Sequence, residues 1–387
     1  MADINKRGPG CEDGEGERGK RGKRGPRGRD GERGERGESG ATKRRCTCAC
    51  AECPDCPKVT LAGCSAVKSP YFINVCCNCK SVEGQPCICQ PNTRDDGISI
   101  AIQDVGTCIN GTIVLVAGAL IDTDYFLYQV NNLAGRGYRV ITVTLRGNGA
   151  SDQPYDSYSY DIWADDLRQV LDCLAVDDVT LVGHSTGSGV AIHYAARHEC
   201  CHIGRLVLTA TAPLDTTFAV PAVALDGIIA AQLADYPATA AFLAGLVFFP
   251  QVPSSETLQF IIRSELETNL YSNIQQNLFV QRTAPTDNIL LNDLPNVCVP
   301  TLILHGTQDL LTPFGIALQL NAGIAGSMLV PFVNSGHLLM ITESQLYNDQ
   351  LDLFASTGTC THCEDPYIAC KKLVGWHLTN GPEFEEP

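Results

Sequence analysis

Between about residues 96 and 356, short apolar runs rich in β-branched residues alternate with longer stretches whose apolar residues recur at helical spacing. We expect the short runs to form strands, and they cover residues 97–106, 111–118, 138–145, 178–183, 205–210, 301–306 and 327–332. We expect helices in the longer stretches, at residues 125–137, 159–176, 189–197 and 345–354, and in a long insert before residue 301. Strands separated by helices of this length predict an α/β fold with a mostly parallel sheet and right-handed crossovers.

Three other regions flank this alternating segment. Residues 1–45 are of low complexity and carry a glycine at every third position from Gly16 to Gly40. Residues 46–95 are rich in cysteine and show no helical periodicity, and residues 357–387 form a tail with three more cysteines. We therefore expect a low-complexity arm, a Cys-rich segment, one α/β domain over residues 96–356 and a Cys-containing tail.

The formal charge is divided unevenly along the 387 residues. The chain carries −15 in total, yet residues 1–45 hold 14 Lys and Arg against 9 Asp and Glu. The arm is therefore basic and the rest of the chain strongly acidic. Because binding by phosphate neutralisation needs a basic surface, we do not expect the body of the protein to bind nucleic acid.

No apolar stretch of the sequence is long enough to predict a membrane span. The N-terminal residues run into glycine and charge without the apolar core of an export signal. The longest nearly apolar stretch, residues 238–249, is far shorter than the ~20 residues of a spanning helix. We expect a soluble protein made in the cytoplasm, and the sequence leaves open where it acts, a spore or cell-surface layer included.

The segment Gly183-His184-Ser185-Thr186-Gly187 lies directly between an expected strand and an expected helix. A serine flanked by glycines two positions away on either side is typical of the tight strand-to-helix turn that exposes a nucleophile at the edge of a sheet. The pattern alone is weak, but its position between strand and helix makes it specific. Ser185 is therefore the candidate nucleophile.

A serine nucleophile needs a histidine base, and the base needs an orienting acid. Asp309 and His337 each follow an expected strand and lie on a loop, in the chain order serine, acid, histidine that this turn requires. Asp215, which follows the preceding strand, is a rival for the acid. His305 ends a strand, where a histidine more often packs than reacts. The other histidines, in the helix and turn after Ser185 and in the tail, fit this order less well.

The negative oxygen of a tetrahedral intermediate needs two hydrogen-bond donors. By position, the first donor is the backbone N–H of Thr186, the residue after the nucleophile. The second is the backbone N–H of Ala119, in the turn after the expected strand 111–118. Backbone donors leave no side-chain signature, so this expectation rests on position alone.

Six segments in this order resemble the α/β-hydrolase superfamily, and within it the bacterial cofactor-free haloperoxidases, or perhydrolases, and related esterases. They are LRGNGASDQP, YDIWADDLRQVLDCL, LVGHSTGSGVAIHYAARH, RLVLTATAP, VPTLILHGTQDLLTP and SGH. The resemblance covers about residues 96–356 and implies an eight-stranded sheet with a helical cap at about residues 215–295. It implies a catalytic triad at Ser185, Asp309 and His337, with no metal and no cofactor. It also implies ester hydrolysis, with formation of peracids from carboxylic acids and peroxide as a further activity.

The sequence departs from the family pattern at two turns. The family usually has His-Gly in the oxyanion turn, where this chain has Ala117-Gly118. The usual Arg-Gly-His-Gly loop contains Asn148 in place of the histidine, although Gly147 and Gly149 remain. Neither change affects the three expected catalytic residues, so the enzyme interpretation stands.

The cysteines and the glycine repeat allow several interpretations. Twelve of the 20 cysteines lie between Cys46 and Cys108, and their spacing fits disulfides or intermolecular cross-links, zinc ligation or free thiols. Glycine at every third residue fits a collagen-like triple helix, which would make a homotrimer. A nucleic-acid-binding arm and a solvated tail are the alternatives. A structural coat protein that has recruited a hydrolase fold is the second functional hypothesis beside a serine esterase.

Overall fold

The computed structural model describes residues 71–75, 79–80, 88–89, 98–119, 122–156, 158–200 and 202–358. The predictions for the Gly-X-Y repeat, for most of the Cys-rich segment and for the C-terminal cysteines lie outside these residues.

The centre of the fold is an eight-stranded sheet with the order β1-β4-β6-β5-β7-β8-β9-β10. Its strands are β1 (Tyr71–Val75), β4 (Ile98–Gly106), β5 (Thr112–Val116), β6 (Arg139–Val143), β7 (Val179–His184), β8 (Ile203–Thr209), β9 (Thr301–Gly306) and β10 (Met328–Phe332). The strands from β6 to β10 pair in parallel, whereas β4 pairs antiparallel with both β6 and β1. The predicted mostly parallel, eight-stranded sheet is confirmed, and each of the seven expected strands is present.

The eighth strand, β1, is not among the strands expected from the sequence, although four of its five residues are strand formers. It lies before residue 96, in the segment expected to be Cys-rich, and pairs along its full length with β4, from Tyr71 with Ile102 to Val75 with Ile98. A second, two-stranded pair, β2 (Cys79–Lys80) and β3 (Ile88–Cys89), follows it. The sheet therefore includes residues from outside the expected bounds of the α/β domain.

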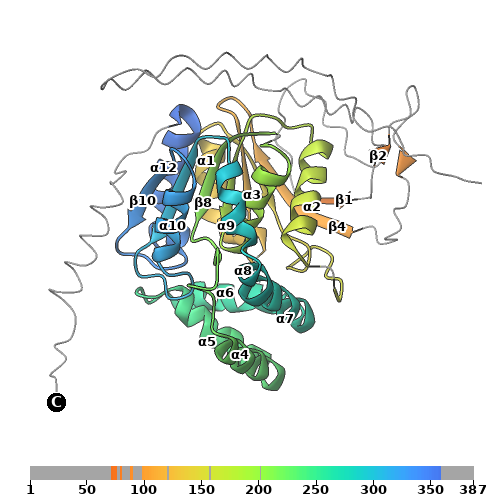
Figure 1. Ribbon diagram of the computed structural model, residues 1–387. Helices are drawn as coiled ribbons and strands as arrows, with labels where there is room; N and C mark the ends of the chain where they lie inside the picture. Colours follow the sequence, from red (N-terminus) through yellow and green to blue (C-terminus); the bar gives the residue numbers. More distant parts are fainter. Residues whose placement is uncertain are drawn as a thin grey trace, which may run out of the picture. The chain divides into compact units, whose positions relative to one another are not determined.

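Helices cover both faces of the sheet (Figure 1). On one face the apolar core includes side chains of α2 (Tyr160–Cys173), α3 (Thr186–Arg197), α9 (Ile289–Asp293) and α10 (Gly315–Gly323). On the other face it includes side chains of α1 (Leu127–Gly135), α11 (Leu339–Thr342) and α12 (Ser344–Thr357). Because successive strand residues point to opposite faces, Val114 packs in the first core and Leu115 in the second. Burial on both faces explains why β5, β7 and β9 are almost continuously apolar.

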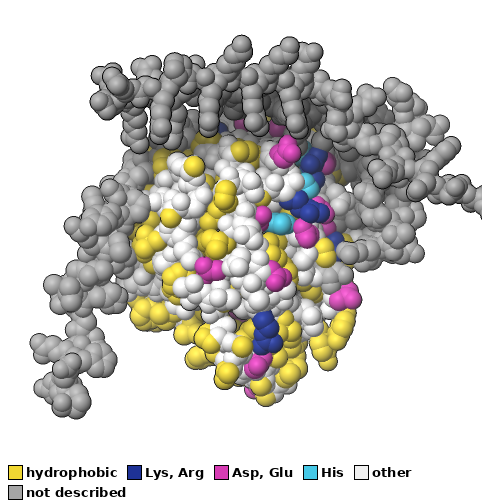
Figure 2. Space-filling view, in the orientation of Figure 1, with side chains coloured by type: hydrophobic (Ala, Val, Ile, Leu, Met, Phe, Trp, Pro, Cys, Tyr) yellow, Lys and Arg dark blue, Asp and Glu magenta, His cyan; other side chains and the backbone are white. Residues whose placement is uncertain are grey.

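Four helices form a cap between β8 and β9, and Figure 1 shows them gathered at one end of the sheet. They are α4 (Ala222–Ala234), α5 (Tyr236–Val247), α6 (Ser255–Leu266) and α7 (Leu270–Leu278). A short π-helix (Phe279–Thr283) and α8 (Ala284–Thr286) lead back to α9, whose Leu290 packs in the core of the body. Hydrophobic side chains gather on the outer surface of the cap, among them the exposed Val223, Leu233 and Phe242 (Figure 2).

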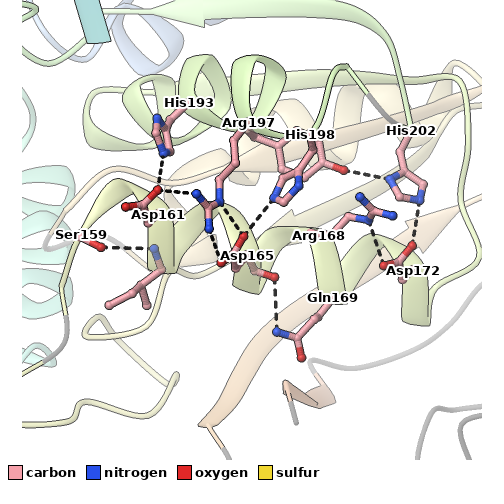
Figure 3. A network of polar contacts seen from close by, with 12 residues as sticks. Ser159, Asp161, Asp165, Arg168, Gln169, Asp172, His193, Arg197, His198 and His202 are labelled. Carbon is pink, nitrogen blue, oxygen red and sulfur yellow. Dashed lines mark hydrogen bonds and ion pairs between the residues drawn. The ribbon is translucent and has the colours of Figure 1, made fainter. Parts of the chain in front are cut away.

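A network of polar contacts between acidic and basic side chains joins α2 to α3, the helix that follows Ser185, and to the turn after α3 (Figure 3). The contacts are Arg197 with Asp161 and Asp165, His193 with Asp161, His198 with Asp165, and His202 and Arg168 with Asp172. His193 also lies 2.7 Å from Asp293 of α9, so one imidazole joins three helices. The network holds the second half of α3 against α2 and α9.

The helix α3 begins at Thr186, three residues earlier than its expected start at residue 189. The backbone N–H groups of Ser188 and Gly189 already donate to the carbonyl oxygen of Ser185, which closes the first turn. At the other end of the helix, Cys200 forms a disulfide with Cys298, 98 residues further along the chain. Among the described residues, no helix is long and apolar enough to cross a bilayer.

Candidate active site

Ser185 occupies the turn between β7 and α3 in a backbone conformation that is rare for residues other than glycine. Its φ is 53° and its ψ is −120°. The turn is tight enough that a side chain at Gly183 would run into the backbone of Gly187, and one at Gly187 into the carbonyl of Val116. The two flanking glycines are therefore a steric requirement of this tight strand-to-helix turn, and Ser185 lies at its apex in a rare backbone conformation.

The turn after β5 lies directly against Ser185. A methyl group placed on Gly118 would be 2.9 Å from the Cβ of Ser185, so no larger residue fits there without movement. Ala119 follows in the same turn, and Thr186 is the first residue of α3, where backbone N–H groups have no partner within the helix. The two expected oxyanion donors thus belong to segments that meet at Ser185.

Asp309 and His337 form a buried hydrogen-bonded pair. The His337 Nδ1 lies 2.7 Å from the Asp309 Oδ2, and both residues are less than 7 % exposed. The aspartate lies on the loop after β9 and the histidine on the loop after β10. The two loops lie close together because neighbouring parallel strands end at the same edge of the sheet. Burial opposes ionisation of the Asp309 carboxyl, but His337 and the backbone N–H of Thr312 outweigh it and lower its pKa to about 2. The carboxylate is therefore charged at every pH at which the protein is expected to work.

The Asp309 carboxylate accepts three further hydrogen bonds from the turn that follows it. The backbone N–H groups of Leu311 and Thr312 donate to Oδ1 at 2.8 and 2.9 Å. The Thr312 hydroxyl donates to Oδ2 at 2.7 Å. His305 at the end of β9 is fully buried, and its Nε2 lies 2.6 Å from the carbonyl oxygen of Thr312. This burial agrees with the expectation that His305 packs.

His184, the residue before the serine, lies beside His337. Its Nε2 is 3.1 Å from the carbonyl oxygen of His337, and the two ring centroids are 4.8 Å apart. Burial and the neighbouring His337 lower the pKa of His184 to about 3, so its ring is neutral at physiological pH and donates through Nε2–H. The residue between Gly183 and Ser185 thereby supports the loop that carries His337.

The end of α5 in the cap also contacts the loop that carries His337. The backbone N–H of Leu338 donates to the carbonyl oxygen of Val247 at 3.3 Å, and the Gln251 side chain donates to the carbonyl of Asn334. A side chain at Gly336 would collide with the carbonyl of Phe249. The position of His337 thus depends on the cap as well as on the sheet.

The loop that contains Asn148 is tied to the cap as well. The Asn148 side-chain N–H donates to the Gln276 Oε1 at 3.0 Å, and the Gln276 amide donates back to the carbonyl oxygen of Gly147. Gly147 and Gly149 have φ of 91° and 44°, which explains why these two glycines are needed in the loop. The asparagine that replaces the usual histidine therefore fixes a body loop to α7.

The rival residues have other partners. Asp215 accepts from the Gln319 side chain at 2.9 Å and from the Thr217 backbone N–H at 2.8 Å. His193, His198 and His202 belong to the α2–α3 network. The two tail histidines lie outside the described residues, and within those residues no group of three or more His, Cys, Asp or Glu is arranged to hold a metal.

Sequence reasoning missed three features of this site: the hydroxyl of Thr312, the contact of His184 with the His337 backbone, and the contacts from the end of α5. Thr312 had a local signal, since a hydroxyl residue three positions after an aspartate can bond back to its carboxylate. The other two join segments far apart in the chain and have no local signal.

Three comparisons with known proteins identify the family to which this fold is similar. A family model described as the alpha/beta hydrolase fold matches residues 111–243. The AB hydrolase superfamily protein YisY of Bacillus subtilis is 35% identical over 269 residues, which cover 68% of this chain and 97% of that protein. The bifunctional esterase/perhydrolase DCH of Acinetobacter calcoaceticus is 27% identical over 277 residues, covering 68% of this chain and 98% of the relative. The solved structure of an esterase from Exiguobacterium antarcticum superimposes with a TM-score of 0.62 at 29% identity and covers 67% of this chain and 97% of that one.

Proposed function

The chain belongs to the alpha/beta hydrolase superfamily, and we propose that it cleaves carboxylic esters with Ser185 as the nucleophile. Its relatives include esterases and non-heme haloperoxidases, and this supports a hydrolase that acts on esters. In the proposal, His337 is the general base and Asp309 orients it. The observation that carries the proposal is the buried Asp309–His337 pair, together with the hydrogen bond that joins the His337 backbone to His184, the residue before a serine with a φ of 53°.

The proposed reaction begins when the Ser185 hydroxyl attacks the ester carbonyl. Asp309 accepts the Nδ1–H of His337, so Nε2 carries the free lone pair and takes the serine proton. The tetrahedral intermediate collapses, the imidazolium returns this proton to the leaving alkoxide, and an acyl-serine remains. Water then attacks the acyl group by the same route, giving the carboxylic acid and free Ser185.

The negative charge that develops on the carbonyl oxygen needs donors that are already in position. We assign this role to the backbone N–H groups of Thr186 and Ala119. The contact between Gly118 and Ser185 supports this assignment, because it brings the turn that contains Ala119 next to the nucleophile. Neither donor depends on the identity of its own side chain, so the Ala117-Gly118 departure from the family pattern leaves both in place.

A perhydrolase activity is a second candidate function, favoured by the similarity to the Acinetobacter esterase/perhydrolase. In this reaction hydrogen peroxide replaces water as the attacking group on the acyl-serine. His337 takes the proton of the attacking peroxide and passes it to the Ser185 oxygen as the intermediate collapses, so the products are a peracid and free Ser185. The same three residues would serve both reactions.

The direct test is hydrolysis of a panel of p-nitrophenyl esters by the full chain and by Ser185→Ala. The proposal expects turnover by the wild type, with a preference among acyl chain lengths, and none above background for the variant. A second arm adds peroxide and bromide and measures peracid formation and bromination. A wild type inactive on every ester, together with thiol-dependent multimers on non-reducing gels, would instead support a coat protein with a recruited hydrolase fold.

A further inference from the structure

The hydroxyl of Thr312 lies at the centre of the Asp309–His337 pair. It is 2.7 Å from the Asp309 Oδ2, the same oxygen that accepts the Nδ1–H of His337. It is also 3.2 Å from the His337 Nδ1 and 3.3 Å from the carbonyl oxygen of Ala210. The shortest contact of the hydroxyl is thus with the carboxylate, and its oxygen faces the imidazole.

Four donors surround the buried carboxylate. Two backbone N–H groups donate to Oδ1, and His337 and Thr312 donate to Oδ2. The backbone donors would survive any substitution at position 312, whereas the donor from the threonine side chain would not. Because Thr312 is only 3 % exposed, no bulk water replaces a donor that is lost there.

His305 fixes the turn from which Thr312 reaches the carboxylate. Its Nε2 lies 2.6 Å from the Thr312 carbonyl oxygen and its ring packs edge-on to Phe314. Burial lowers the pKa of His305, so the ring is neutral and donates through Nε2–H. The backbone of Thr312 is therefore fixed next to Asp309, and the hydroxyl itself is held by its contacts with the Asp309 Oδ2 and the Ala210 carbonyl oxygen.

We propose that Thr312 is a positioning residue whose hydroxyl holds Asp309 and His337 in the orientation that leaves the His337 Nε2 free to accept the serine proton. This inference rests on the proposed function. The hydroxyl donates to Oδ2, and its oxygen offers the Nδ1–H a second acceptor on the same side of the ring. Both contacts favour the tautomer with the proton on Nδ1.

Loss of the hydroxyl should change the chemistry more than substrate binding. Loss of the donor at 2.7 Å leaves the charge on the Asp309 Oδ2 less dispersed, which stabilises the imidazolium form of His337 and outweighs the loss of the longer, 3.2 Å contact to Nδ1. The acid limb of the profile of kcat/KM against pH should then move to higher pH. The other titratable groups that face the pair are His184, against the His337 ring, and His305, whose Nε2 is 3.8 Å from the Asp309 Oδ2; burial keeps both neutral, so neither supplies this shift. A purely structural role for Thr312 would lower the amount of active enzyme without moving this limb.

The experiment compares Thr312→Val, which keeps the shape of the side chain, with Thr312→Ser, which keeps the hydroxyl. Thr312→Val should lower kcat about tenfold or more, change KM less than about twofold, and move the acid limb up by about half a pH unit or more. Thr312→Ser should restore both kcat and the limb to near wild-type values. Thr312→Ala serves if the valine variant does not fold, since it also lacks the hydroxyl and should show the same shift.

Thr142→Val is the matched control, because Thr142 is a fully buried strand threonine whose hydroxyl has no hydrogen-bond partner. It should leave kcat and the pH profile unchanged. The inference is overturned if folded Thr312→Val or Thr312→Ala keeps the wild-type kcat and limb, or if Thr312→Ser is as impaired as they are. An inactive wild type, or an active Ser185→Ala, would overturn the proposed function and the inference that rests on it. If the wild type is active and Ser185→Ala is inactive, the proposed function stands, and the Thr312 variants then test the inference alone.

Discussion

The Nε2–H of His184 donates to the carbonyl oxygen of His337, so the residue before Ser185 supports the backbone of the proposed general base. Two segments 153 residues apart in the chain are joined by this contact, and both residues are buried. The nucleophile turn and the histidine loop therefore cannot move independently without breaking a buried hydrogen bond.

Replacing His184 by phenylalanine keeps an aromatic ring but removes this donor. The buried carbonyl of His337 is then unsatisfied, which should cost about 1–3 kcal/mol of unfolding free energy. We expect kcat to fall several-fold while labelling of Ser185 by a fluorophosphonate remains. Urea unfolding at pH 7 and ester kinetics measure the two effects.

The same variant has a consequence at low pH. The pKa of His184, about 3, lies below its ordinary value of 6.5, so the wild-type native state loses stability as the pH falls from about 6.5 towards 3. In His184→Phe this part of the acid sensitivity should be absent. Equal slopes of stability against pH in the two proteins would contradict the buried, neutral state of His184.

Asp309→Asn separates the two candidate acids. An amide at this position donates to His337 or fails to orient it, which favours the wrong tautomer, so kcat should fall on the order of 10³- to 10⁴-fold. Asp215→Asn is the matched control, because Asp215 bonds to Gln319 and to the backbone of Thr217. It should retain near wild-type activity. The reverse pattern of losses would assign the orienting role to Asp215.

Gly336→Ala tests whether the cap holds the histidine loop. Its methyl group would collide with the carbonyl oxygen of Phe249, so the end of α5 or the loop must shift. We expect kcat to fall by tenfold or more, because His337 is the next residue and small displacements of a catalytic group are costly.

Gly245→Ala provides the comparison, because a methyl group there meets no atom within 4 Å and the position lies inside α5. It should leave activity unchanged and stabilise the fold by about 0.5–1 kcal/mol. If Gly336→Ala is as active as Gly245→Ala, the cap does not hold His337 in place.

His193→Gln tests the ion-pair network between α2 and α3. Burial opposes protonation of His193, but hydrogen bonds to Asp293 and Asp161 outweigh it and raise its pKa above 6.5. The contribution of His193 is therefore complete below pH 6.5 and is lost as the pH rises through the raised value. The free energy of unfolding should decline between pH 6 and pH 9 in the wild type more than in the variant. The difference between the two declines should be at most about 1 kcal/mol, since Asp161 is exposed.

The comparison variant for this network is Arg197→Gln. Arg197 pairs with Asp161 and Asp165 but does not titrate between pH 6 and 9. Because Arg197 shares the Asp161 Oδ1 with His193, its loss should leave the decline in stability between pH 6 and pH 9 in place or increase it, whereas loss of His193 should reduce it. A wild type whose stability is flat over this range would show that His193 does not bind a proton more tightly in the folded state.

The parts of the site that could be predicted from sequence are those with a local cause. Gly183 and Gly187 flank Ser185 because the turn is sterically closed, and an apolar strand and a helix adjoin it. Asp309 and His337 each follow a strand in a polar loop, and the order of a parallel sheet brings two such loops together. For these residues, periodicity and turn chemistry predicted the place in the fold, and their catalytic roles stay a prediction.

The remaining features depend on contacts between distant segments. The edge strand β1 is five residues long and acquires its role only by pairing with β4. The disulfide between Cys200 and Cys298, and the contact of Val247 with Leu338, likewise join positions whose neighbourhood is set by the whole fold. No local pattern distinguishes these cysteines from the sixteen that flank the middle of the chain.

The central claim is that Ser185 becomes acylated, and the most direct measurement is the mass of the full chain after reaction with a fluorophosphonate. We predict one adduct per wild-type chain, located on the peptide that contains Ser185, with loss of ester hydrolysis in proportion to labelling. Ser185→Ala should acquire no adduct and hydrolyse no ester above background. An adduct on another residue, or undiminished hydrolysis by Ser185→Ala, would contradict the account.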